Sequence, residues 1–207
     1  MVVVATRNAH KVAELTRILA AGTVIGAGVE LVSLAGFPGA PDAAETGCTF
    51  AENALIKARA VAAFTGLPAV ADDSGLSVDA LNGMPGVLSA RWAGRHGDDA
   101  ANLELVLAQL ADVPPGRRGA RFVCAAALVQ PGAGGPIERV VEGRLEGKLA
   151  TRPRGSNGFG YDPIFVPDGQ ARTTAEMAPE EKDAISHRGR AFRALAPVIA
   201  ELLAGRA

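Results

Sequence analysis

The stretch TFAENALIKARAVAAFTGLPAVADDSG, residues 49–75, decides the fold class because it places a helix, a helix stop and a strand in succession. Thr49 and Glu52 have the spacing of a capping box, in which each side chain bonds a backbone N–H that the first helical turn leaves free. Gly66 predicts the end of the helix, since glycine readily adopts the left-handed conformation of a helix C-cap. The apolar residues of 68–71 then predict a short buried strand.

Strand and helix patterns also alternate on both sides of this stretch, which favours an α/β fold. Before it, the sequence predicts a strand over Val2–Ala5, a helix over His10–Ala20 and a strand near Glu30–Leu34. After it come a loop-rich region over Leu76–Gly97, a helix over Asp98–Leu110, a hairpin of strands over Arg121–Gln130 and Arg139–Leu149, and a strand over Pro163–Val166. A last helical region runs from Pro179 to Leu203, and Pro197 should kink or split it.

The composition bears on the binding partners and the cellular location of this chain. Its 207 residues, 48% of them hydrophobic, suffice to bury a core without disulfides, and we expect Cys48 and Cys124 to be small buried residues. The balance of 21 Lys and Arg against 22 Asp and Glu argues against a protein that grips nucleic acid through bulk charge. Apolar runs are far shorter than the roughly 20 residues of a membrane helix, and no signal-peptide pattern is visible. We therefore expect a soluble, cytoplasmic protein with neither nucleic acid nor membrane as a partner.

The first candidate site is the turn between the first strand and the first helix. It is made of Thr6, Arg7, Asn8, Ala9, His10 and Lys11. Free backbone N–H groups and the positive end of a helix favour anions there, and Lys11 supplies a point charge suited to phosphate. Taken alone, the same residues also fit an ordinary helix cap with a solvated lysine.

The second candidate is acidic and follows the predicted strand at 68–71. Asp72 and Asp73 come directly after the strand, and Glu45 and Glu52 precede it in the chain. Carboxylate oxygens are the ligands that Mg²⁺ uses beside substrate phosphates. Successive strand residues face opposite sides, so we expect Asp72 and Asp73 to do different jobs. The alternative for Asp-Asp-Ser-Gly is a common polar turn.

The third and fourth candidates lie in the last third of the chain. Glycines surround Phe159, Tyr161 and Asp162, a composition that suits a flat slot for a nucleobase, although an ordinary turn with both aromatic residues in the core is an equal alternative. Lys182 and the segment Ser186–Gly189, which holds His187 and Arg188, could bond a purine edge or could simply cap a helix.

In their order along the chain these segments resemble one family closely, the inosine triphosphate pyrophosphatases, also called non-canonical purine NTP pyrophosphatases or XTP/dITP diphosphatases. The matching stretches are Ala5–Lys11, Glu45–Gly47, Thr49–Ala54 with Lys57, Ala71–Leu76, Pro85–Gly86 with Ser89–Arg91, Gly158–Phe165, Glu181–Lys182 and Ile185–Gly189. Each is weak alone, and the ordered set, which covers nearly the whole chain, is specific.

The resemblance implies a fold, a reaction and a set of roles. The fold is a single domain over residues 1–207, an elongated, mixed and twisted sheet flanked by helices, with two lobes around a central nucleotide cleft, assembled as a homodimer. The reaction is Mg²⁺-dependent hydrolysis of ITP, dITP and XTP to the monophosphate and pyrophosphate, which clears deaminated purines from the nucleotide pool. Asp73 is the implied general base and a metal ligand, and Glu45 is a second metal ligand. The implied substrate-binding residues are Thr6, Arg7, Asn8, Ala9, His10, Lys11, Ser74, Phe159, Gly160, Tyr161, Asp162, Lys182, His187 and Arg188, with Lys57 and Glu52 near the phosphates or the metal.

Two positions depart from the family pattern, and other functions remain open. Arg7 stands where the family often has glycine, and Ala44 stands where some relatives carry a second acid. A pyrophosphatase for modified pyrimidine triphosphates is one alternative, and a non-catalytic sensor of purine triphosphates is another. The presence of both Asp73 and Glu45 argues against the sensor, because a sensor needs no full acidic set.

Overall fold

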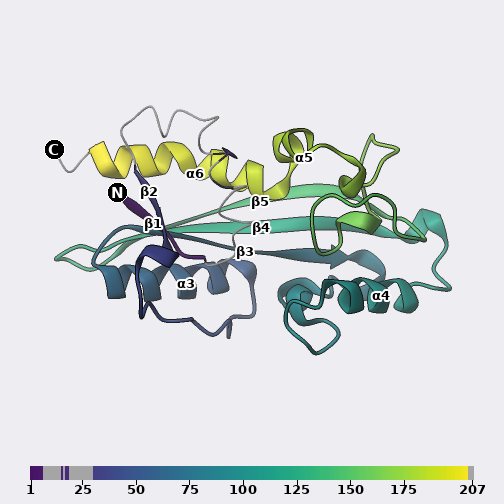
Figure 1. Ribbon diagram of the computed structural model, residues 1–207, viewed down its shortest axis with the longest axis horizontal. Coiled ribbons are helices and arrows are strands. Elements are labelled where there is room, and N and C mark those ends of the chain that lie inside the picture. The colour runs from purple at the N-terminus through teal and green to yellow at the C-terminus, as the bar shows by residue number, and fades with distance from the viewer. Residues whose placement is uncertain (7–14, 16, 19–29, 205–207) are drawn as a thin grey trace. The chain divides into compact units, whose positions relative to one another are not determined.

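The computed structural model describes residues 1–6, 15, 17, 18 and 30–204, and it is a mixed α/β structure (Figure 1). One six-stranded sheet has the order β2-β1-β3-β4-β5-β6. The strands are β1 (Val2–Val4), β2 (Leu31–Ser33), β3 (Ala69–Val78), β4 (Gly119–Gln130), β5 (Ile137–Leu149) and β6 (Phe165–Pro167). The helices are α3 (Phe50–Thr65), α4 (Asp99–Gln109), α5 (Pro179–Ile185) and α6 (His187–Ala204). The helix expected over His10–Ala20 falls mostly outside the described residues.

The sheet is mixed, as expected. β1 pairs in parallel with both β2 and β3, whereas β5 pairs antiparallel with β6. β4 and β5 are neighbours in the sheet and are joined through 131–136, a connection too short for the crossover that a parallel pair needs. The hairpin predicted for these two strands is therefore confirmed.

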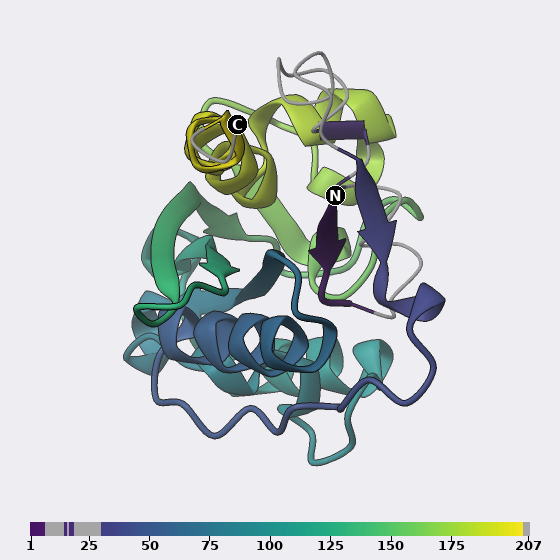
Figure 2. The same cartoon turned by 90° about the vertical axis from the view of Figure 1, so that its left-hand side faces the viewer.

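The chain divides into two compact units. Unit 1 comprises Met1–Asp73, Cys124–Gly143 and Arg188–Ala207, and unit 2 comprises Ser74–Val123 and Arg144–His187. In unit 1, α3 and α6 cover opposite faces of the strands (Figures 1 and 2). Unit 2 has its own apolar core, in which α4 packs on residues of β3, β4, β5 and β6.

Alternation along β3 assigns its side chains to the two faces of unit 1. Val70 packs in the core that contains Phe192 and Leu195 of α6. Ala69 and Ala71 pack in the other core, which contains the apolar residues of α3. Because the side-chain period of a strand is two residues, Asp72 follows Val70 onto the α6 face and Asp73 follows Ala71 onto the α3 face.

Helix α3 has the ends that its sequence predicts. Thr49 accepts a hydrogen bond from the backbone N–H of Glu52, and Glu52 accepts one from Thr49, which completes the capping box. Gly66 ends the helix in the left-handed conformation, with φ of 67°. This fixed start matters for function, because it sets the register in which α3 presents Asn53 and Lys57.

Strand β3 is longer than predicted, and this corrects the interpretation of its acidic residues. The predicted strand ended at Ala71, but β3 continues through Asp72, Asp73 and Gly75 to Val78. Leu76 and Val78 are fully buried in the core of unit 2, and burial of these two side chains extends the strand beyond its apolar start. Asp-Asp-Ser-Gly is therefore not a turn.

The C-terminal helices also differ from the expectation. The break falls at Ser186, between α5 and α6, and α6 runs on through Pro197 without being split. Pro197 lies on the exposed side, while Leu195, Ala196 and Ile199 hold the buried side in the core of unit 1. Packing of this buried side in the core of unit 1 therefore outweighs the helical hydrogen bond that a proline cannot donate.

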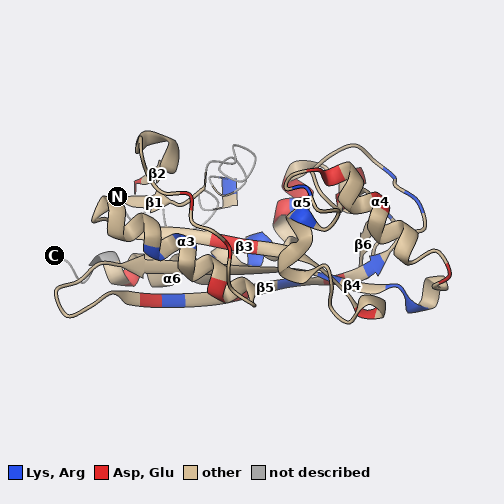
Figure 3. Cartoon of the chain, turned by 90° about the horizontal axis from the view of Figure 1, so that it is seen from below, with Lys and Arg blue, Asp and Glu red and all other residues tan. Residues whose placement is uncertain are grey.

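Among the described residues, no helix is both long enough and apolar enough to cross a bilayer. Acidic and basic residues are interspersed along the described helices and strands, as Figure 3 shows. Cys124 is buried, but Cys48 is exposed just before α3, so the expectation that both cysteines are buried is wrong for Cys48. Neither of them forms a disulfide.

Candidate active site

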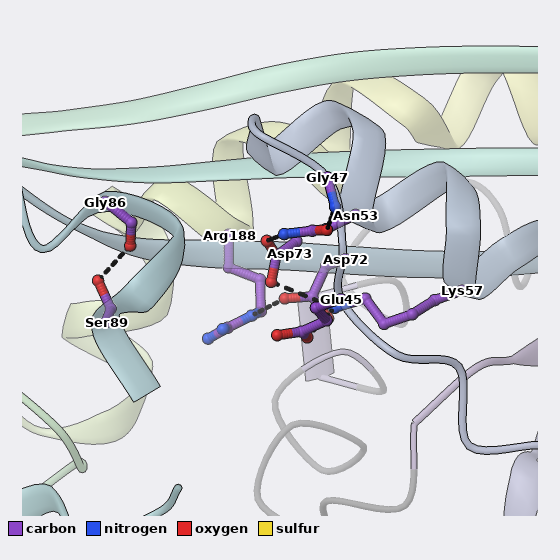
Figure 4. Close-up of polar contacts among 9 residues, drawn as sticks. All are labelled: Glu45, Gly47, Asn53, Lys57, Asp72, Asp73, Gly86, Ser89 and Arg188. Atoms are coloured by element: carbon purple, nitrogen blue, oxygen red, sulfur yellow. Dashed lines mark hydrogen bonds and ion pairs between the residues drawn. The ribbon is translucent and has the colours of Figure 1, made fainter. Parts of the chain in front are cut away.

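The two adjacent aspartates of β3 lie on opposite faces and have different partners (Figure 4). Asp72 is bonded by Arg188 of α6, whose Nε lies 3.2 Å from Asp72 Oδ2. Asp73 accepts hydrogen bonds from two residues of α3, Asn53 and Lys57. Both carboxylates are at least nine-tenths buried. The two aspartates thus have different partners, and the expectation that they do different jobs stays a prediction.

Both oxygen atoms of Asp73 are held from helix α3. Asn53 Nδ2 lies 3.1 Å from Oδ2, and Lys57 Nζ lies 3.2 Å from Oδ1. Asn53 and Lys57 are one helical turn apart, so they project from the same side of α3. Lys57 Nζ also lies 2.9 Å from Oε1 of Glu45, in the loop before the helix. One ammonium group thus joins the two carboxylates predicted to bind metal.

These contacts oppose one another in setting the pKa values of the cluster. Burial raises the pKa of Asp73 above its usual value, and the nearby charge of Glu45 raises it further, while Lys57 and Asn53 act to lower it. Burial lowers the pKa of Lys57, but the charges of Asp73, Asp72 and Glu45 outweigh it and leave this pKa raised. Lys57 is therefore a cation, and Asp73 is a stronger base than an exposed aspartate.

The donor set around Lys57 fits a divalent cation such as Mg²⁺. Oε1 of Glu45 and Oδ1 of Asp73 converge on one ammonium, which is a positive charge already placed between two hard oxygen ligands. Along the described part of the chain, no group of three or more His, Cys, Asp or Glu side chains gathers as a metal cage. Two carboxylates suffice for Mg²⁺, because it usually completes its shell with water and substrate phosphates.

Glu52 serves the backbone in this structure. Its Oε2 accepts hydrogen bonds from the backbone N–H groups of Cys48, at 2.6 Å, and Thr49, at 3.2 Å. These contacts stabilise the start of α3. A place for Glu52 near the phosphates or the metal stays a prediction, and capping is the role that the contacts support.

The second cluster lies in unit 2, on the glycine-rich segment that ends in Asp162. Asp162 is buried, and its Oδ2 accepts hydrogen bonds from the Phe159 N–H at 2.9 Å and from Lys182 Nζ at 2.6 Å. Its Oδ1 accepts one from Thr174 Oγ1 at 2.8 Å. The adjacent Gly158 has φ of 77°, and a Cβ there would collide with the Asp162 carboxylate.

The two aromatic residues of this segment differ in solvent exposure. Tyr161 is buried, and its hydroxyl donates to the carbonyl oxygen of Ser89 at 2.8 Å. Burial raises the pKa of Tyr161 well above its usual value, so the phenol stays neutral. Phe159 remains 37% exposed, and Lys182 Nζ lies 5.2 Å from the centre of its ring. Of the two, Phe159 is the aromatic face that a planar ligand could contact.

The other predicted residues of unit 2 lie as follows. His187 is buried and stacks on Phe122, with ring centres 4.9 Å apart and an interplanar angle of 18°. The backbone N–H of Gly160 donates to Asp99 Oδ2, at 2.8 Å, at the start of α4. Ser74 is half-buried within β3. Lys182, Asp162 and Phe159 are thus brought together, and His187 contacts an aromatic neighbour.

The first predicted loop is described only at its start. The backbone N–H of Thr6 donates to the carbonyl oxygen of Val4 at 2.8 Å, directly after β1. Arg7, Asn8, Ala9, His10 and Lys11 lie outside the described residues, so their place at the phosphates stays a prediction. The same holds for the role of Arg188 at a purine edge, although the structure gives Arg188 a buried contact with Asp72.

Sequence reasoning missed two polar residues that hold the clusters together. Asn53 bonds Asp73, and Thr174 bonds Asp162. The available signal for Asn53 is its place in α3, where it is buried together with Ala54 and Ala58. A fully buried amide at such a position requires a partner. Thr174 carried no comparable signal, since threonine is common in turns.

Comparison with known proteins identifies the family of this chain. The Ham1 family matches residues 2–198, and the chain belongs to this family. A protein of Streptomyces coelicolor named dITP/XTP pyrophosphatase is 61% identical over 97% of this chain and 98% of its own length. A protein of Frankia alni with the same name is 62% identical over 98% of both chains. The resemblance inferred from the motifs is confirmed.

Solved structures give the same result. A dITP/XTP pyrophosphatase structure from Mycobacterium abscessus has a TM-score of 0.75 at 62% identity and covers 95% of this chain and 98% of its own. A HAM1 protein of Coxiella burnetii has a TM-score of 0.84 at 44% identity and covers 97% and 98%. The expected mixed α/β fold is that of the Ham1 proteins.

Proposed function

We propose that this chain hydrolyses dITP, XTP and ITP to the nucleoside monophosphate and pyrophosphate. The names of the relatives support this substrate class, since they are dITP/XTP pyrophosphatases at about 60% identity over nearly the full chain. The observation that carries the proposal is the group of Asp73, Glu45 and Lys57, which combines a buried base, a second acid and a cation.

Asp73 is the base that accepts a proton from the water attacking the α-phosphorus. Its raised pKa suits this work, because a base poised nearer to neutral pH accepts a proton more readily. Glu45 and Asp73 would hold Mg²⁺, which when bound neutralises charge on the departing pyrophosphate. Lys57 contributes a further positive charge beside both carboxylates.

The base of the nucleotide binds at the Asp162 cluster. Phe159 offers an exposed ring for stacking, and Lys182 and His187 offer donors for the 6-oxo group of hypoxanthine or xanthine. Adenine carries an amino group at that position and would leave a donor without a partner, which is costly in a buried site. The other substrate-binding residues that the resemblance implies are Tyr161, Gly160 and Ser74 of unit 2 and Arg188 of unit 1, and Thr6 to Lys11 would bind the phosphates.

Location and assembly belong to the same proposal. The resemblance supports a cytoplasmic homodimer of single-domain chains. Size-exclusion chromatography with light scattering tests the assembly, and a mass of one chain at micromolar concentration would contradict it.

The test of the reaction is pyrophosphate release from dITP, XTP, ATP, GTP and dTTP, each with Mg²⁺ and with EDTA. We expect metal-dependent release confined mainly to dITP and XTP. Orthophosphate instead of pyrophosphate would place the attack at the γ-phosphorus. Nucleotide binding without release of pyrophosphate would favour a non-catalytic sensor of purine triphosphates. Pyrophosphate release from dTTP alone would favour a pyrophosphatase for modified pyrimidine triphosphates.

The test of the base is Asp73→Asn. This substitution keeps the shape of the side chain and removes its capacity to accept the proton, so we expect turnover to fall at least about a hundredfold. Circular dichroism and nucleotide binding serve as controls that the variant folds. Near-normal turnover would rule Asp73 out as the base.

A further inference from the structure

We propose that Asn53 is a positioning residue, which orients the Asp73 carboxylate and the Gly47 turn with the two ends of one side-chain amide. This inference rests on the proposed function only in that Asp73 is the base. The motifs of the sequence gave Asn53 no role, and its contacts alone suggest one.

The amide of Asn53 can have only one orientation. The backbone N–H of Gly47 lies 2.8 Å from one end of the amide, and an N–H can only donate. That end is therefore Oδ1, which leaves Nδ2 to face Asp73 Oδ2 at 3.1 Å. Asp73 thus receives a donor at this oxygen, which favours its ionised form (Figure 4).

The same amide ties the loop before α3 to the helix. Gly47 is two residues after Glu45, the other acid of the Lys57 cluster. A Cβ on Gly47 would lie 2.8 Å from Asn53 Oδ1 and 2.6 Å from Cβ of Glu52, so only glycine brings the turn this close. Asn53 therefore links the segment that carries Glu45 to the carboxylate of Asp73.

Burial makes this link specific. Asn53 has no solvent-exposed surface, so water cannot replace either hydrogen bond. Its place on α3 is fixed by the capping box four residues earlier. Misplacing a reacting group by about 1 Å costs on the order of a hundredfold in rate. An amide held this firmly can maintain such precision.

The decisive variant is Asn53→Asp, because it separates the two contacts. A carboxylate at this position still accepts from Gly47 N–H, but it faces Asp73 with an acceptor and a like charge. We expect kcat for dITP to fall about 10- to 100-fold while KM changes less than about threefold, since the nucleotide contacts are intact.

Asn102→Asp is the matched control. Asn102 is also buried, and its Oδ1 accepts from the backbone N–H of Ala93 at 2.7 Å. Its Nδ2 has no hydrogen-bond partner among the described residues, so it contacts no carboxylate of the site. We expect this variant to keep kcat within about twofold. An equal loss of kcat in both variants, or none in Asn53→Asp, would overturn the proposal.

The double variant Asn53→Asp with Asp73→Asn distinguishes positioning from folding. It again pairs one carboxylate with one amide, but the carboxylate is now at residue 53 on α3 and the amide at residue 73 on β3. We expect its melting temperature to exceed that of Asn53→Asp, while turnover stays lost. Recovery of turnover would contradict the assignment of both residues.

A readout independent of activity uses the side-chain NH₂ resonances of ¹⁵N-labelled protein without nucleotide. We expect the Asn53 pair to exchange slowly with solvent and to move in Asp73→Asn but not in Asn102→Asp. Fast exchange or an unmoved resonance would refute the Asn53–Asp73 contact, even if the wild-type protein hydrolyses dITP. Conversely, a wild-type protein that releases no pyrophosphate would refute the proposed function while this contact could still stand.

Discussion

Lys57 is the residue on which the charges of the acidic cluster depend. Its ammonium contacts both Glu45 and Asp73 from inside unit 1, where its own side chain is 16% exposed. At such depth, charges act on one another more strongly than at the surface. The pKa of Asp73 is therefore a balance, raised by burial and by Glu45 and held down by Lys57 and Asn53.

Removing this cation has a predictable effect on the pH dependence. Asp73 must be ionised to accept a proton, so kcat/KM falls as the pH falls through its raised pKa. Lys57→Met removes the charge that lowers this pKa, and we expect the acidic limb of the pH profile to move to higher pH. The profile of the wild-type protein is the comparison. A limb that stays in place or moves to lower pH would contradict the electrostatic balance described above.

The raised pKa of Asp73 also affects folding stability: activity rises with pH through this pKa, whereas stability falls. A raised pKa means that folded Asp73 keeps its proton at pH values where the unfolded chain has lost it. Asp73 therefore destabilises the folded state as the pH rises from its ordinary pKa to the raised one.

Single residues of the site were predictable from the sequence where their chemistry is distinctive. Asp73, Glu45 and Lys57 were all singled out, and the structure brings them together. Asn53 and Thr174 were not, because an amide or a hydroxyl is informative only once its buried partner is known. The partners of Asn53 lie six residues before it and twenty residues after it, so no local pattern joins them.

At the scale of elements, α3 is the helix that the active site requires. Its capping box fixes the start from which Asn53 and Lys57 are presented. We expect Thr49→Ala to lower the free energy of unfolding by about 1 kcal/mol, as loss of an N-cap does. Urea denaturation measures this change.

Thr49→Ser is the control for this prediction, because serine retains the capping oxygen. It should preserve most of the stability. A loss in Thr49→Ser as large as that in Thr49→Ala would point to packing of the threonine methyl group instead of the cap.

The elements themselves were predictable where periodicity and caps agree, as in α3. They were not where tertiary contacts decide. β3 extends past its apolar start because Leu76 and Val78 are buried in the core of unit 2. α6 tolerates Pro197 because its buried side is anchored both before and after it. Neither effect can be read from a window of local sequence.

At the scale of the whole molecule, nucleotide binding should stabilise the fold. A ligand that binds only the folded state adds about 2.7 kcal/mol when it is present at a hundred times its Kd. Asp73→Asn allows the measurement without turnover. We expect its melting temperature to rise with dITP and Mg²⁺ and to rise less with dATP. Equal shifts for the two nucleotides would contradict recognition of the 6-oxo group.

The division into two units explains how much of the global fold the sequence could supply. The alternation of strands and helices indicated an α/β fold, and the family resemblance supplied the mixed sheet. The separate core of unit 2 draws on residues from four strands that are distant in sequence. Such a core has no local signature, so it becomes visible only when the strands are placed.

The Lys57 contact has a consequence for how the protein meets the metals of a cell. A pair of carboxylates held close together attracts zinc and copper ions, which bind protein ligands more tightly than magnesium does. Here the ammonium of Lys57 already lies between Glu45 and Asp73 as a covalently attached counter-ion. A free metal ion must displace the Lys57 ammonium from both carboxylates, and the ammonium then loses its ion pairs. A metal ion that arrives with a triphosphate also brings phosphate oxygen atoms, with which the lysine can form new ion pairs. We therefore expect the nucleotide-free protein to bind free zinc or copper ions weakly at Glu45 and Asp73.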